Sequence, residues 1–132
     1  MTKNEILDIL HSKIEQADFE CIQDDMVEEM EQCENQFEFV EPILQLMEDH
    51  PDGDFGVPGA LTHFIEHFSQ NGYEDLLLQS VRRKPTAHNI WLLHRACNDA
   101  NDPMHDEYES LAEHLKSIPN LSEDVKSQLK MF

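Results

Sequence analysis

Two histidines and a glutamate form the segment of this sequence whose residue types most suggest catalysis. The segment His63-Phe64-Ile65-Glu66-His67 matches the H-x-x-E-H pattern of inverted zincins, and on a helix it places both imidazoles on one face. Catalytic zinc, however, normally has a third protein ligand and an open, supported pocket. Five-residue patterns also arise by chance in a chain with eight histidines. We therefore expect no catalytic zinc site and no enzymatic activity.

The three cysteines, Cys21, Cys33 and Cys97, form no C-x-x-C pair. Their odd number argues against the disulfide framework of a secreted protein, and the missing pair argues against a cysteine zinc site. The chain also has no Ser-His-Asp order, no glycine-rich phosphate loop and no cysteine-histidine signature. We expect reduced thiols, no metal and no cofactor.

Acidic residues are distributed very unevenly along the chain. From Ile14 to Val81 there is no lysine or arginine, while these 68 residues include 18 aspartates and glutamates. Residues 1–66 have a net charge of −16, and residues 67–132 a net charge of −3. A surface of one sign repels itself and attracts a partner of the opposite sign. We therefore expect a basic partner, although the acids could instead serve only to keep a small helical protein soluble.

The same charge excludes two classes of partner. Carboxylates repel phosphate groups, so we expect neither direct nucleic-acid binding nor attachment to an anionic membrane. The first residues of the chain place acids among apolar residues and lack a small-residue cleavage site, and no stretch approaches about 18 consecutive apolar residues. We expect a cytoplasmic protein with no signal peptide and no membrane-spanning segment.

Apolar residues recur three and four positions apart along nearly the whole chain, and no stretch alternates as a strand does. At 132 residues the chain has the length of one domain, so residues 1–132 are expected to form a single helical domain. The pattern predicts an all-α protein, with about eight helices joined in antiparallel pairs into a compact, HEAT-like α-α array. Candidate helix caps are Asn35, Thr86 and the pair Asp102-Pro103.

One segment breaks the helical pattern. Residues 50–59 contain three of the four glycines and two of the six prolines, which is typical of a turn-rich loop with a fixed shape. The helix after this loop is expected to end at Asn71-Gly72, a plausible C-cap pair.

The helix predicted from about residue 19 to residue 33 has an apolar face and an acidic face. At 100° per residue, Ile22, Met26, Met30 and Cys33 lie on one side. Like charges four positions apart repel one another by a few tenths of a kcal/mol per pair, and a basic partner would relieve that repulsion. The opposite side carries Glu20, Asp24, Glu28 and Glu31, with Asp25 and Glu29 flanking them.

Part of the chain resembles a known family. The resemblance covers roughly residues 52–98 and leaves out the acidic first third of the chain. It is carried by Gly53-Asp54-Phe55-Gly56-Val57-Pro58-Gly59-Ala60-Leu61, His63, Glu66, Arg83-Lys84-Pro85-Thr86, Trp91-Leu92-Leu93 and Arg95 to Asn98. These segments resemble small helical immunity proteins of bacterial polymorphic toxin and contact-dependent growth inhibition systems. Near the tryptophan, Asn89 and His94 depart from the family pattern.

The resemblance implies a cytoplasmic protein that binds one toxin domain, blocks its active site and has no catalysis of its own. Nuclease toxins have basic substrate clefts, which an acidic protein can occupy in place of the phosphate backbone. We expect the toxin to contact the helical acids Glu20, Asp24, Asp25, Glu28 and Glu31 and the loop acids Asp52 and Asp54. The alternative, supported by charge alone, is an acidic nucleic-acid mimic or a helical adaptor for a basic host protein.

Overall fold

The computed structural model describes all 132 residues and contains eight α-helices, one short 3-10 helix and no strand. The all-α prediction and the number of helices are therefore confirmed. None of the helices combines the length and the apolar character that crossing a membrane requires. The elements are α1 (Lys3–Lys13), α2 (Phe19–Glu31), η1 (Gln36–Phe39), α3 (Val40–Asp49), α4 (Ala60–Glu66), α5 (Tyr73–Arg83), α6 (Ala87–Cys97), α7 (His105–Lys116) and α8 (Glu123–Leu129).

The chain divides into two compact units, Met1–Tyr73 and Glu74–Phe132. The division also separates the charges. The first unit holds 18 acids and 2 bases, for a net charge of −16, and the second holds 10 acids and 7 bases, for a net charge of −3. The acidic character of the protein therefore belongs to the first unit. That residues 1–132 form one domain stays a prediction.

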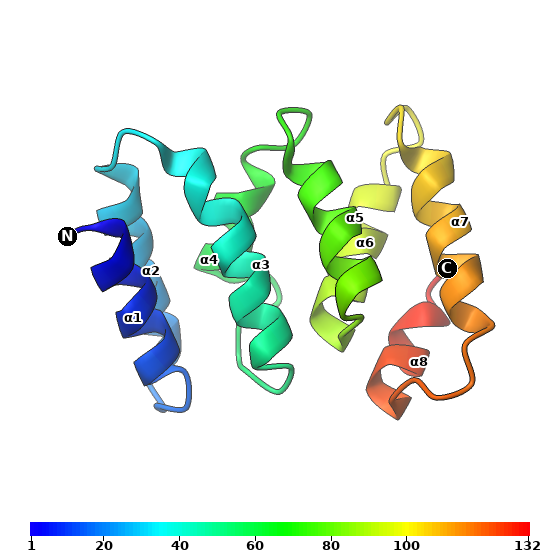
Figure 1. Ribbon diagram of the computed structural model, residues 1–132, viewed down its shortest axis with the longest axis horizontal. Helices are drawn as coiled ribbons and strands as arrows, with labels where there is room; N and C mark the ends of the chain where they lie inside the picture. Colours follow the sequence, from blue (N-terminus) through cyan, green and yellow to red (C-terminus); the bar gives the residue numbers. More distant parts are fainter. The chain divides into compact units, whose positions relative to one another are not determined.

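The first unit consists of two helical hairpins, α1 with α2 and α3 with α4, whose partners run antiparallel (Figure 1). Helix α2 is the central element, because it packs against α1, against α4 and against η1. Apolar side chains from every element of the unit fill its interior, where burial of each large side chain stabilises the fold by about 1.5–3 kcal/mol. The buried set includes Ile6, Leu10, Phe19, Met30, Phe39, Val40, Ile43, Leu44, Leu46, Met47, Leu61 and Ile65.

The inner face of α2 differs from the predicted stripe at two positions, because Ile22 and Cys33 are only half-buried and Cys33 lies beyond the end of the helix. Phe19, Gln23, Met26 and Met30 are buried, whereas Ile22 is only half-buried. Gln23 can occupy an interior position because its side-chain amide finds a backbone acceptor in another segment. Sequence periodicity carries no information on such a tertiary hydrogen bond. It therefore predicts that Ile22, and not Gln23, is buried.

In the second unit, α6 packs against both α7 and α8. The predicted cap at Thr86 is confirmed. Its hydroxyl accepts a hydrogen bond from the Asn89 backbone N–H (3.1 Å), and Asn89 Oδ1 accepts one from the Thr86 N–H (2.8 Å). The Asn89 amide also donates to the Lys84 carbonyl (2.8 Å) and to Ser80 Oγ (3.3 Å). The buried Asn89 thus joins the start of α6 to the end of α5.

Three predicted helix ends are wrong in detail. Asn35 makes no side-chain cap, and a 3-10 turn precedes α3. Helix α7 begins at His105, because Asp102 does not cap it: one carboxylate oxygen accepts from the Met104 N–H (2.8 Å) and the other from the Tyr108 hydroxyl (3.1 Å). Helix α4 ends at Glu66, and turns follow up to Gly72, whose φ of 103° requires a glycine.

Candidate partner-binding surface

The five predicted contact residues of α2 all lie on the solvent side of that helix. We call Glu20, Asp24, Asp25, Glu28 and Glu31 the α2 ridge, and each of these side chains is exposed. The opposite face of α2 is buried in the first unit, and this burial fixes the rotation of the helix about its own axis. All five ridge side chains are therefore turned toward solvent. The predicted segregation of charge and apolar residues on α2 is therefore confirmed.

Apart from Glu20 in the first turn, the charges of the ridge do not stabilise the helix that carries it. Helix α2 contains six acids and no basic residue, and three of those acids, Glu28, Glu29 and Glu31, fall in its last turn. Acids near a helix C-terminus oppose the helix dipole by roughly 0.3–1 kcal/mol each, and like charges at i,i+4 add a smaller cost. Glu29, which flanks the ridge, is paired with the N-terminal amino group of Met1 at 3.3 Å. A cationic partner would stabilise this arrangement.

The loop acids Asp52 and Asp54 are also exposed, and the loop that carries them is tied to α2. The side-chain amide of Gln23 donates to the Asp54 carbonyl oxygen at 2.8 Å. The Asp54 carboxylate accepts from the Gly56 N–H at 3.1 Å, so this side chain also shapes the loop. Phe55 is buried and meets the ring of Phe19 edge-on. The loop is therefore anchored to the helix that carries the ridge.

Glycine is required at two positions of this loop, Gly56 and Gly59. A Cβ atom at Gly59 would overlap the Phe55 carbonyl oxygen, and one at Gly56 would meet the Gly59 backbone at 2.7 Å. Gly56 also has a φ of 76°, which favours glycine. This packing agrees with the turn-rich loop of fixed shape that the sequence predicts for residues 50–59.

A groove of about 440 Å3 lies along the ridge. Asp24, Val27 and Glu31 of α2 form part of its lining, and His63 of α4 and His67, the C-cap residue of α4, form another part. The remaining lining residues are Gln36, Ala60, Phe64 and Phe68. An apolar floor with carboxylates at its edge suits a lysine or arginine side chain, whose stem is apolar and whose head is cationic.

The H-x-x-E-H segment lies beside the same groove. His63 and His67 are exposed and share one face of α4, as the pattern predicts, while the intervening Glu66 is half-buried. Both imidazoles line the groove that Asp24 and Glu31 also line. Sequence reasoning treated these histidines and the acidic helix separately, because no local pattern indicates that α2 and α4 pack together.

A second hollow, of about 520 Å3, lies between the α1–α2 turn and the α3–α4 loop. Asp52 and Asp54 line it, and so do Glu15 and Asp49, two exposed acids that sequence reasoning did not single out. Four carboxylates thus surround one hollow. The shortage of bases between residues 14 and 81 was the available signal, but only the fold shows that the two turns meet.

Comparisons with protein-family models, with curated proteins and with solved structures found no match to this chain.

Proposed function

We propose that this chain is an immunity protein that binds a cognate toxin domain and covers its active-site cleft. The toxin domain is a basic nuclease, and the contact surface comprises the α2 ridge, the loop acids Asp52 and Asp54, and the groove beside the ridge. The protein acts in the cytoplasm by binding alone and has no catalytic activity.

The observation that carries this proposal is the exposure of all five ridge carboxylates on a helix without a basic residue. Such an arrangement lowers the stability of the free protein, so its benefit is expected in a complex. A field of one sign also speeds the capture of an oppositely charged partner, by orders of magnitude at low salt. Fast capture suits a protein that must intercept a toxin before damage occurs.

The groove supports a specific partner over a general acidic mimic. A nucleic-acid mimic needs regularly spaced surface charge, whereas this groove combines charge with the apolar side chains of Val27, Phe64 and Phe68. A pocket with apolar walls restricts binding to partners that present a side chain of matching shape, which charge spacing alone does not require. The resemblance to immunity proteins of bacterial toxin systems supports a toxin as that partner.

A pull-down tests the proposal. Tagged full-length protein is used as bait in a lysate of the native cell at low and at moderate salt, and the retained proteins are identified by mass spectrometry. We expect a single basic nuclease domain that stays bound at both salt concentrations. Several nucleic-acid-binding proteins that dissociate together as salt rises would overturn the immunity function and favour the acidic mimic or adaptor.

A matched pair of variants tests the surface itself. In one bait, Asp24, Glu28 and Glu31 are replaced by lysine. In the control bait, the exposed acids Asp124, Glu107 and Glu113 of the second unit are replaced by lysine, so that the net charge changes equally. We expect the first bait to lose the toxin domain and the control bait to retain it. Circular dichroism spectra of both baits establish that the helices are intact.

A further inference from the structure

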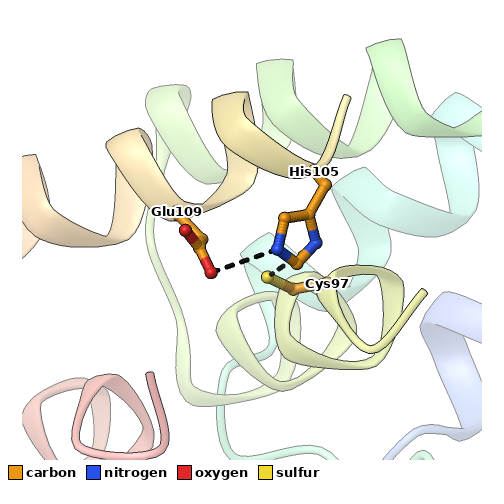
Figure 2. Close-up of side chains that lie close together, drawn as sticks. All are labelled: Cys97, His105 and Glu109. Carbon is orange, nitrogen blue, oxygen red and sulfur yellow. Dashed lines mark hydrogen bonds and ion pairs between the residues drawn. The ribbon is translucent and has the colours of Figure 1, made fainter. Parts of the chain in front are cut away.

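Three side chains of different chemistry converge in the second unit (Figure 2). Cys97 Sγ lies 3.7 Å from His105 Nδ1, and His105 Nε2 lies 3.1 Å from Glu109 Oε1. One ligand atom from each residue lies within 4.8 Å of the other two. Cys97 and His105 are half-buried, while Glu109 is exposed. The cluster therefore has one side in the protein and one side open to solvent.

Helix geometry places these residues together. His105 is the first residue of α7, and Glu109 follows four positions later on the same face. Cys97 is the last residue of α6, and α6 packs against α7. The turn between the two helices is held by Asp99 and Asp102, each of which accepts a hydrogen bond from a backbone N–H two residues later. The donor set thus rests on two packed helices joined by a well-defined turn.

We propose that Cys97, His105 and Glu109 form a binding site for Zn²⁺ or a similar borderline divalent metal ion. Thiolate, imidazole and carboxylate are the three side-chain ligands that zinc accepts, at about 2.3, 2.0 and 2.1 Å. For a tetrahedral ion these lengths require the ligand atoms to lie roughly 3.3–3.6 Å apart. The contacts of 3.7 and 3.1 Å use opposite nitrogens of the His105 ring, and an ion binds only one of them. With one ligand atom taken from each residue, the three atoms lie within 4.8 Å of one another, and rotation of the exposed Glu109 side chain can close the remaining gap.

The donor types also select the metal. A cysteine sulfur disfavours Mg²⁺ and Ca²⁺, which take oxygen ligands. Three protein ligands leave a fourth position for water, on the open side where Glu109 is exposed. Bound metal would link the end of α6 to the first turn of α7. This site lies outside the acidic surface of the first unit, and the inference does not depend on the proposed function.

A nucleophilic cysteine is a different use of the same side chains. Burial, and secondarily the charge of Glu109, raises the pKa of the Cys97 thiol. Catalytic cysteines have lowered pKa values, because the thiolate is the nucleophile. A metal ion instead supplies the positive charge that stabilises a thiolate in such surroundings.

Calorimetry and spectroscopy of the full-length, metal-free protein test the site. Titration with Zn²⁺ is expected to show one ion bound per chain. Titration with Co²⁺ is expected to produce a thiolate-to-metal charge-transfer band together with the visible bands of a tetrahedral ion. The single variants Cys97→Ser, His105→Gln and Glu109→Gln should each weaken Zn²⁺ binding at least roughly 10-fold. Circular dichroism spectra show whether each variant remains folded.

Two matched controls locate the site. Cys33→Ser removes another half-buried thiol, and it should leave the charge-transfer band unchanged. The double variant His63→Gln/His67→Gln removes the histidine pair of α4, and it should bind Zn²⁺ as the unaltered protein does. Absence of the charge-transfer band, or Zn²⁺ binding lost in the histidine double variant and retained in Cys97→Ser, would overturn the proposal.

Discussion

The side-chain amide of Gln23 donates a hydrogen bond to the backbone carbonyl oxygen of Asp54 at 2.8 Å. This contact joins the middle of α2 to the loop between α3 and α4, across 31 positions of sequence. Gln23 is 1% exposed, so the bond forms in the interior, on the face of α2 that lies opposite the acidic α2 ridge. The two groups of acids that we assign to partner binding are therefore held in one arrangement by a polar contact.

Replacing Gln23 with alanine should lower the free energy of unfolding by about 1–3 kcal/mol, because it leaves a cavity and an Asp54 carbonyl without its donor, which together outweigh the removal of the buried, unpartnered Gln23 Oε1. Urea denaturation measures this difference. Gln45→Ala, at an exposed position of α3, is the matched control and should shift the free energy of unfolding by less than about 0.5 kcal/mol. Equal midpoints for all three proteins would contradict the structural role of Gln23.

Gly59→Ala should destabilise the protein by about 1–3 kcal/mol, because the added methyl group would overlap the Phe55 carbonyl oxygen and the backbone must move. Since Phe55 adjoins Asp54, the same change should weaken binding of the partner. Thermal unfolding and the pull-down measure the two effects. An alanine at Gly59 that leaves the melting temperature unchanged would show that the loop is not held as described.

Asn89→Ala should lower the free energy of unfolding by about 2–4 kcal/mol, because it removes three side-chain hydrogen bonds in the interior of the second unit. Chemical denaturation followed by circular dichroism is the measurement. Asn98→Ala, at the exposed C-cap of α6, is the comparison and should cost little. Similar losses for the two variants would contradict the role assigned to Asn89.

Stability should fall at alkaline pH through Tyr108. Burial, and secondarily Asp102, raises the pKa of this phenol above its ordinary value of about 10. A folded-state pKa above the unfolded value gives a stabilising contribution that is complete below about pH 10 and decreases as pH rises further. Denaturation midpoints of the parent protein should therefore decline above that pH.

Tyr108→Phe is the companion variant. At neutral pH it should be less stable by about 1–3 kcal/mol, because the buried Asp102 carboxylate loses a hydrogen bond. Its stability should decline less steeply above about pH 10, because it has no phenol at this position to ionise. Parallel slopes for the two proteins would exclude Tyr108 as the source of the alkaline effect.

Local patterns in the sequence were sufficient to predict the helices and one of their caps. Thr86 lies three positions before Asn89, and the reciprocal hydrogen bonds between them form within a single turn. Asp102 followed by Pro103 has the same local appearance, but its carboxylate binds Tyr108 and the Met104 N–H, so α7 starts later. A cap residue with a competing partner further along the chain cannot be recognised from spacing alone.

The predicted contact residues were found from charge and helical period, which are local properties. The groove beside them was not predictable, because it requires α2 and α4 to pack together, and neither Asp24 nor His63 carries a signal of the other. Cys97, His105 and Glu109 were missed for a related reason. Cysteine metal sites are recognised in a sequence by paired cysteines, whereas these three residues come from two helices and share no known spacing.

Inhibition by charge-reversed protein tests the central claim most directly. The nuclease activity of the captured toxin domain is measured against increasing amounts of the unaltered protein and of the variant with lysine at Asp24, Glu28 and Glu31. We predict complete inhibition at one equivalent of the unaltered protein and none at one equivalent of the variant, with both proteins equally helical. Full inhibition by the variant would contradict the claim that the α2 ridge binds the toxin.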